Sequence, residues 1–138
     1  IMYEDISMLN VTSWQHWVAV AEGDYCDGLI YINLTDKSFE TTKRLYATGN
    51  FSKYIPYGAK RIEAVADDEA LKLLAFAKDK KTVLIVINDT DDEKSVTVPA
   101  INSEITVATT DKDNNLAERK TKNADIKISA KSVNTIMF

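Results

Sequence analysis

The residues best suited to acid–base chemistry form one short acidic cluster, at Glu22, Asp24 and Asp27. Two carboxyl groups that flank a glycosidic bond can hydrolyse it, and a retaining enzyme holds them about 5–5.5 Å apart. Such pairs normally lie at rigid strand ends, whereas residues 22–28 include two glycines and are typical of a surface loop. We therefore expect these acids to be solvated rather than catalytic.

A second acidic run, Asp111-Lys-Asp113-Asn-Asn115, matches the opening of a calcium-binding loop. Such a loop also needs glycine at its sixth position and glutamate at its twelfth, where this sequence has Leu116 and Lys122. The run therefore predicts a polar hairpin turn, as does the acidic run at residues 89–93. No P-loop or G-x-G-x-x-G motif is present, so we expect neither a metal nor a cofactor.

Nucleophilic catalysis has little support in the sequence. His16 is the only histidine, and no G-x-S-x-G elbow places a serine beside a base. Cys26 is the only cysteine, which excludes an internal disulfide and a CxxC zinc site, and its acidic neighbours oppose thiolate formation. We interpret His16 as structural and Cys26 as inert.

The two tryptophans, Trp14 and Trp17, are the strongest candidates for ligand contact. Residues 13–21 are apolar and aromatic enough for a buried strand, although periodicity alone does not exclude a helix. On a strand, side chains three positions apart point to opposite faces. Both indoles could belong to the core, or one could offer its flat apolar face to the C–H face of a sugar ring. The residue pattern alone leaves both interpretations open.

Length and composition limit the class of protein. The chain has 138 residues, 45% of them hydrophobic, with a formal charge of −4 and a pI near 5.0. This charge argues against nucleic acid as a partner, since phosphate binding needs clustered Lys and Arg. No apolar run approaches the roughly 18 residues of a membrane span. The chain is also too short for a whole (β/α)8 barrel, which takes about 250 residues.

Two segments of different character meet near Pro56 and Gly58, and most aromatic residues, both tryptophans included, precede this point. The order of elements expected in the first segment resembles the end of an α/β barrel. We expect a helix at residues 2–9, strands at 13–21 and 29–33, a turn at 35–38, and a helix at 39–54 that Gly49-Asn50 divides into two pieces.

The second segment predicts only strands. Apolar and polar residues alternate in much of it, and turns rich in Asp, Asn and Lys separate the runs. The apolar run at residues 83–87 indicates a central strand covered on both faces. Short strands at this spacing are typical of an antiparallel sandwich. The expected strands are 61–66, 71–77, 82–88, 94–99, 104–110, 116–121, 125–129 and 133–138.

Several separated motifs point to a known family. The most specific is Gly49-Asn-Phe-Ser-Lys-Tyr-Ile55 followed by Pro56, Gly58 and Arg61-Ile62, with Ser13-Trp-Gln-His-Trp17 and Asp27-Gly-Leu-Ile30 before it. Near the end stands Ser129-Ala-Lys-Ser-Val-Asn-Thr-Ile136. In this order they resemble the C-terminal part of glycoside hydrolase family 30, which includes glucosylceramidases, endo-β-1,6-galactanases and glucuronoxylanases.

The resemblance implies a mainly β fold. Residues 1–56 would be the terminal helix–strand–helix portion of a (β/α)8 barrel, and residues 57–138 an antiparallel β-sandwich side domain. It also implies a retaining β-glycosidase whose two catalytic glutamates lie upstream of this chain, so no catalytic residue is expected here. Trp17 matches a tryptophan that lines a sugar-binding subsite, and Tyr25 would be a weaker substrate contact.

On this interpretation the chain alone does not hydrolyse glycosides. Its partner in the parent enzyme is a β-linked oligosaccharide or polysaccharide, and family habit implies an extracellular, periplasmic or cell-surface location. Exposed aromatics of residues 1–56 would favour self-association. Two alternatives stay open: an autonomous carbohydrate-binding or interaction module, and a sandwich that only supports the barrel.

Overall fold

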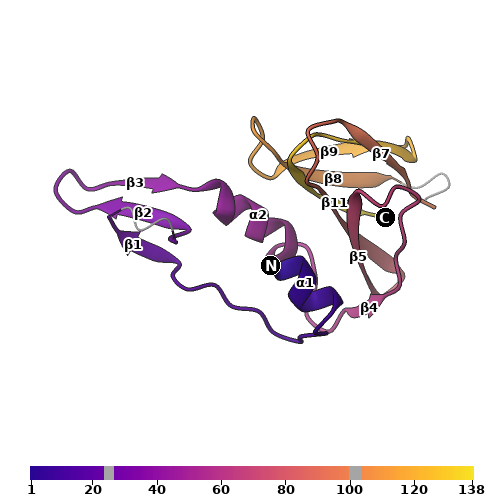
Figure 1. The fold of residues 1–138 in the computed structure, drawn as a ribbon, viewed down its shortest axis with the longest axis horizontal. Coiled ribbons are helices and arrows are strands. Elements are labelled where there is room, and N and C mark those ends of the chain that lie inside the picture. The colour runs from indigo at the N-terminus through magenta and orange to yellow at the C-terminus, as the bar shows by residue number, and fades with distance from the viewer. Residues whose placement is uncertain (24–26, 100–103) are drawn as a thin grey trace. The chain divides into compact units, whose positions relative to one another are not determined.

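The computed structural model describes residues 1–23, 27–99 and 104–138. Asp24, Tyr25 and Cys26 therefore lie outside the described residues. The chain forms two compact units, Ile1–Tyr46 and Ala47–Phe138, and the division falls within one helix (Figure 1). The domain boundary expected between residues 56 and 57 stays a prediction. No helix in the described part of the chain is long and apolar enough to cross a membrane.

The first unit contains a short helix and a three-stranded sheet. Helix α1 spans Met2–Ser7, and the sheet has the order β1 (Val20–Glu22), β2 (Ile30–Asn33) and β3 (Ser38–Thr41). β1 pairs parallel with β2, and β2 pairs antiparallel with β3. The Thr35 amide donates to Asn33 Oδ1 and the Ser38 amide to Asp36 Oδ1, both at 2.9 Å, which closes the hairpin. The first predicted helix, the strand at 29–33 and the turn after it are confirmed.

The strand expected at residues 13–21 is wrong for most of its length. Residues 13–19 are irregular, and only Val20–Glu22 forms a strand. A strand forms only where a neighbour takes up its backbone hydrogen bonds, which local sequence does not reveal. The carbonyl groups of Val18 and Ala19 accept hydrogen bonds from the amides of Leu29 and Ile30 at 3.0–3.3 Å, and the pairing of β1 with β2 begins immediately after them.

The helix expected at residues 39–54 is wrong at its start and in its middle. Residues 39–41 belong to β3, and α2 runs without a break over Lys43–Ser52. Thr42 Oγ1 accepts the Leu45 amide at 3.3 Å, as an N-cap does. Gly49 lies inside the helix because it allows close packing: a Cβ there would lie 2.6 Å from Leu116 Cδ1. Tertiary contact therefore outweighs the low helix propensity of glycine.

The described residues of the second unit form eight strands, and each matches a strand predicted from the sequence. Six of them form a sheet of order β4-β5-β6-β11-β8-β9, and β10 and β7 form a second sheet. All neighbours in both sheets are antiparallel. The strands are β4 (Lys60–Ile62), β5 (Leu71–Lys78), β6 (Lys81–Asn88), β7 (Lys94–Thr97), β8 (Ile105–Thr110), β9 (Ala117–Thr121), β10 (Asp125–Ile128) and β11 (Ser132–Met137).

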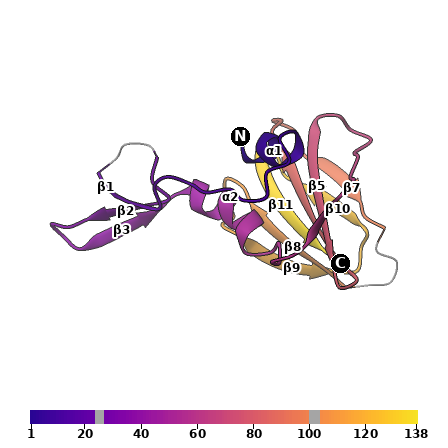
Figure 2. The same ribbon diagram turned by 90° about the horizontal axis from the view of Figure 1, so that it is seen from below.

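A hydrophobic core lies between the two sheets (Figure 2). Val86 and Ile136 of the larger sheet join Ile126 and Ile128 of the smaller one in this core. β6 lies inside the larger sheet, and its residues Val83–Val86 are all buried, with successive side chains on opposite faces. The fold is mainly β, and the predicted antiparallel sandwich with a central apolar strand is confirmed.

Asn50 attaches the end of α2 to the face of the larger sheet that lies away from this core. Its Nδ2 donates to Ala108 O at 3.0 Å and to Thr135 Oγ1 at 2.9 Å, and Thr135 Oγ1 donates to Asn50 O at 2.7 Å. Both side chains are fully buried. Thr135 is paired with Ile85 of β6 in the ladder. The end of α2 therefore lies against the outer face of β11 and β8.

We expect Asn50→Ala to lower the free energy of unfolding by about 2–4 kcal/mol, because each buried polar group left without a partner costs about 1–3 kcal/mol. Thr135→Val should be similarly harmful. The double variant should cost less than the sum of the two, because the residues share their hydrogen bonds. Urea denaturation followed by circular dichroism measures all three values.

Ser52→Ala is the matched control, because Ser52 lies on the exposed side of the same helix. Its free energy of unfolding should stay within about 0.5 kcal/mol of the parent chain. An Asn50→Ala variant as stable as Ser52→Ala would contradict the structural role given to Asn50.

Candidate functional site

Of the two tryptophans that the sequence analysis names as candidates for ligand contact, Trp17 is the more exposed. Its side chain is 86% exposed, whereas Trp14 is partly buried. Exposure alternates along this segment, so that Ser13, Gln15, Trp17 and Ala19 face solvent while Trp14, His16 and Val18 do not. The prediction that the two indoles face opposite ways is confirmed, although residues 13–19 are not themselves a strand. One indole is therefore structural and the other is free to meet a ligand.

Trp14 and His16 form the structural side of this segment. Trp14 Nε1 donates to Asp5 Oδ2 of α1 at 2.9 Å, and the Trp14 and His16 rings stack with centroids 6.0 Å apart and an angle of 23° between their planes. His16 Nε2 lies 2.6 Å from Asp27 O. Since a carbonyl oxygen only accepts, His16 must carry its proton on Nε2. These contacts hold the backbone from which Trp17 projects.

The structure describes two of the three acids of the acidic cluster, Glu22 and Asp27. Glu22 is exposed at the end of β1, and Asp27 is partly buried, with an Oδ1 that has no partner among the described residues. Asp24, and the substrate contact expected at Tyr25, lie outside the described residues. A catalytic pair within this cluster is therefore not tested by the geometry.

Asp111 builds a turn through hydrogen bonds to both of its carboxylate oxygens. The backbone amides of Asp113 and Asn114 donate to its Oδ1 at 2.9 and 2.8 Å, and Ser129 Oγ donates to its Oδ2 at 2.8 Å. Partial burial raises the pKa of this carboxyl, but the hydrogen bonds outweigh it and bring the pKa below the ordinary value. The predicted polar turn is confirmed. In the ranges that the structure describes, no three His, Cys, Asp or Glu side chains gather as metal ligands.

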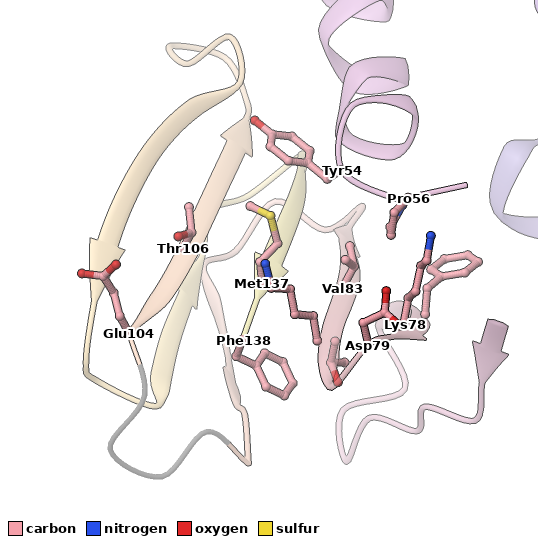
Figure 3. Close-up of a pocket in the computed structure, with 12 residues that line it drawn as sticks. Tyr54, Pro56, Lys78, Asp79, Val83, Glu104, Thr106, Met137 and Phe138 are labelled. Carbon is pink, nitrogen blue, oxygen red and sulfur yellow. The ribbon is translucent and has the colours of Figure 1, made fainter. Parts of the chain in front are cut away.

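The second unit also contains a pocket of about 580 Å³ that no sequence motif predicts (Figure 3). Its walls come from the β5–β6 hairpin, from β8 and β11, and from residues 54–56 after α2. Tyr54 Oη donates to Glu118 Oε1 at 2.8 Å, and burial together with this bond raises the pKa of the phenol. Residues so far apart in the chain meet only through sheet order. A local motif could not have revealed the pocket.

Comparison with known proteins decides the family. Residues 58–136 match the beta sandwich domain of glycosyl hydrolase family 30. The chain belongs to glycosyl hydrolase family 30. This confirms the resemblance found in the sequence. The matched range covers nearly all of the sandwich of this chain, from the start of β4 into the last strand, β11.

Similar proteins are longer than this chain. Lysosomal acid glucosylceramidase from Mus musculus is 27% identical over 101 residues, which cover 66% of this chain and 20% of that protein. The chain thus spans about one fifth of the length of this relative.

Solved structures share the fold over nearly the whole chain. A conserved exported protein from Bacteroides fragilis has a TM-score of 0.88 at 24% identity, covering 99% of this chain and 32% of its own. A glycoside hydrolase family 30 subfamily 8 xylanase from Clostridium acetobutylicum has a TM-score of 0.81 at 22% identity, covering 99% of this chain and 36% of its own.

Single-tryptophan variants test the opposite environments of the two indoles. Trp14→Phe leaves Trp17 as the only tryptophan, and Trp17→Phe leaves Trp14. We expect the emission of Trp17 to lie at longer wavelength and to be quenched several-fold more strongly by acrylamide than that of Trp14. Equal quenching of Trp14 and Trp17 would contradict the alternating exposure of residues 13–19. Trp14→Phe should also lose about 1 kcal/mol of stability with its bond to Asp5.

Asp111→Ala should lower the free energy of unfolding by about 1–3 kcal/mol at neutral pH, since several donors lose one acceptor. The folded-state pKa lies below the ordinary 3.8, so the carboxylate stabilises the fold above that value and loses this effect as the pH falls through the folded pKa. The difference from the parent chain should therefore shrink below pH 3.8. Asp113→Ala, whose exposed side chain lies in the same turn, is the control. Equal pH profiles for the two variants would be contrary evidence.

Proposed function

We propose that this chain is the C-terminal portion of a retaining β-glycosidase that acts on β-linked glycans. In this proposal residues 1–56 complete a (β/α)8 barrel and residues 57–138 form its side sandwich. The family match supports the sandwich, and the likeness of 99% of this chain to about a third of longer proteins supports the whole assignment. The two catalytic glutamates are supplied by residues upstream of this chain.

The observation that carries the proposal is the exposed indole of Trp17. A flat apolar ring can cover the C–H face of a pyranose, and the burial of an aromatic side chain contributes strongly to binding. Trp14 and His16 hold the backbone behind it through Asp5 and Asp27. Trp17 therefore forms one wall of a sugar subsite, which orients the substrate without taking part in bond cleavage. Tyr25 supplies a second, weaker contact.

The parent protein meets its glycan in an extracellular, periplasmic or cell-surface location. The exported status given to the Bacteroides fragilis neighbour supports this inference. The chain by itself should also self-associate at high concentration. Trp17, Val20 and Phe39 of the first unit are all exposed, and exposed apolar groups of this size favour association.

Titration of the whole chain with xylotetraose, cellotetraose and β-1,6-linked galactotetraose tests the subsite. At least one of these should quench tryptophan fluorescence. Calorimetry should show that Trp17→Ala weakens its binding at least about tenfold, because a tryptophan anchor commonly contributes about 2 kcal/mol or more. The chain should not hydrolyse aryl β-glycosides.

Tyr57→Ala is the matched control, because Tyr57 is an even more exposed aromatic, at 98%, in the second unit. It should bind like the parent chain. Equal losses in both variants would mean that exposed aromatics act nonspecifically. Hydrolysis of an aryl β-glycoside by the chain itself would refute the assignment of both glutamates to upstream residues.

A further inference from the structure

The pocket of the second unit is built from rigid elements. In Figure 3, Met137 and Val83 lie at its centre, Tyr54 lies above them, and Lys78 and Asp79 lie on one side. Backbone hydrogen bonds of 2.7 and 3.1 Å join Thr82 to Phe138 along its floor. The volume of about 580 Å³ falls within the range of small-molecule sites, about 300–1,000 Å³.

Hydrogen bonds also fix the rim of the pocket. Lys78 Nζ donates to Tyr57 O at 2.7 Å, which ties the segment after α2 to the β5–β6 hairpin. Lys120 Nζ donates to Glu104 Oε1 at 2.7 Å on the opposite wall. Asp79 and Lys80 have φ of 49° and 64°, as the two central residues of a type I′ hairpin turn do. The site is therefore formed before any ligand arrives.

Three polar groups of the lining remain available to a ligand. The Asp79 carboxylate, the Lys81 amine and the Thr106 hydroxyl have no partner among the described residues, and Lys81 lies directly across from Lys78 in the hairpin. They offer an acceptor, a donor and a group that can do either. The lining also has apolar side chains, among them Phe76, Val83, Met137 and Phe138.

The lining carries charged side chains of both signs. The charged side chains are two lysines, Lys78 and Lys81, and two acids, Asp79 and Glu104. One of these acids, Glu104, is already paired with Lys120, and the lining therefore presents charges of both signs rather than of one. Donors and acceptors beside apolar side chains match a molecule with hydroxyl groups at its edge and C–H groups on its face.

We propose that this pocket binds one pyranose residue of a neutral glycan, as a second sugar site distinct from Trp17. Asp79 accepts hydrogen bonds from ring hydroxyls, Lys81 and Thr106 donate to hydroxyl oxygens, and Met137 and Val83 contact the C–H face. The site gives the sandwich a binding role of its own. It needs neither Trp17 nor the catalytic assignment.

Two-dimensional ¹H–¹⁵N spectra of the whole chain test the site. The probes are methyl β-D-glucopyranoside, methyl β-D-xylopyranoside and methyl β-D-galactopyranoside at millimolar concentrations, with sodium glucuronate as the charged comparison. At least one neutral pyranoside should shift the amide signals of Lys81, Val83, Thr106 and Met137. The variant Asp79→Asn/Lys81→Met should weaken this binding at least about tenfold, as expected for lost hydrogen bonds to charged groups.

Lys112→Met/Asp113→Asn makes the same chemical changes in the β8–β9 turn, away from the pocket lining, and should bind like the parent chain. Thr106→Val should also weaken binding while keeping the shape of the site, which guards against misfolding of the double variant. Trp17→Ala should leave the pocket shifts unchanged, so failure of either sugar site is seen separately. The proposal is overturned if no neutral pyranoside shifts the pocket signals, if only glucuronate does, or if neither pocket variant weakens binding.

Discussion

The reciprocal contact between Asn50 and Thr135 is the constraint on which the second unit depends. It joins residues 85 positions apart, and both partners are buried where no water can replace them. The contact places the end of α2 over β11, next to β8. It thereby fixes the position of Tyr54 and Pro56, which follow α2 and form part of the wall of the pocket. Helix α2 starts in one compact unit and ends in the other. The buried side-chain amide of Asn50 therefore anchors the one helix of the described chain that belongs to both units.

The sandwich could be predicted because its strands carry their own signal. Alternating apolar residues and Asp-rich turns mark several of the strands, and burial follows the alternation there, as at Ile126 and Ile128 beside exposed Lys127. The two wrong elements lacked such a signal. Residues 13–19 look like a strand but are irregular, and regular pairing with β2 begins only at Val20. Gly49-Asn50 looks like a break but serves close packing and the buried bonds of Asn50.

The candidate site could likewise be predicted only in part. Residue types and spacing were enough to place Trp14 and Trp17 on opposite sides of their segment. They could not show that Asp5 and the Asp27 carbonyl hold the structural side, because those contacts are made across the fold. The pocket at Tyr54, Lys81 and Met137 was invisible for the same reason. Its residues are neighbours only in the order of the larger sheet.

Native-state hydrogen exchange on the whole chain tests most directly whether α2 and the sheet form one cooperative structure. A helix as short as α2 is only marginally stable alone. If Asn50 holds it, the Lys53 amide, which donates to Gly49 O, should open with the same free energy as the amides of Ile85 and Ile136. In the Asn50→Ala variant, the Lys53 amide should open with a lower free energy than the amides of Ile85 and Ile136. Exchange of the Lys53 amide in the parent chain long before those of β6 and β11 would contradict this account.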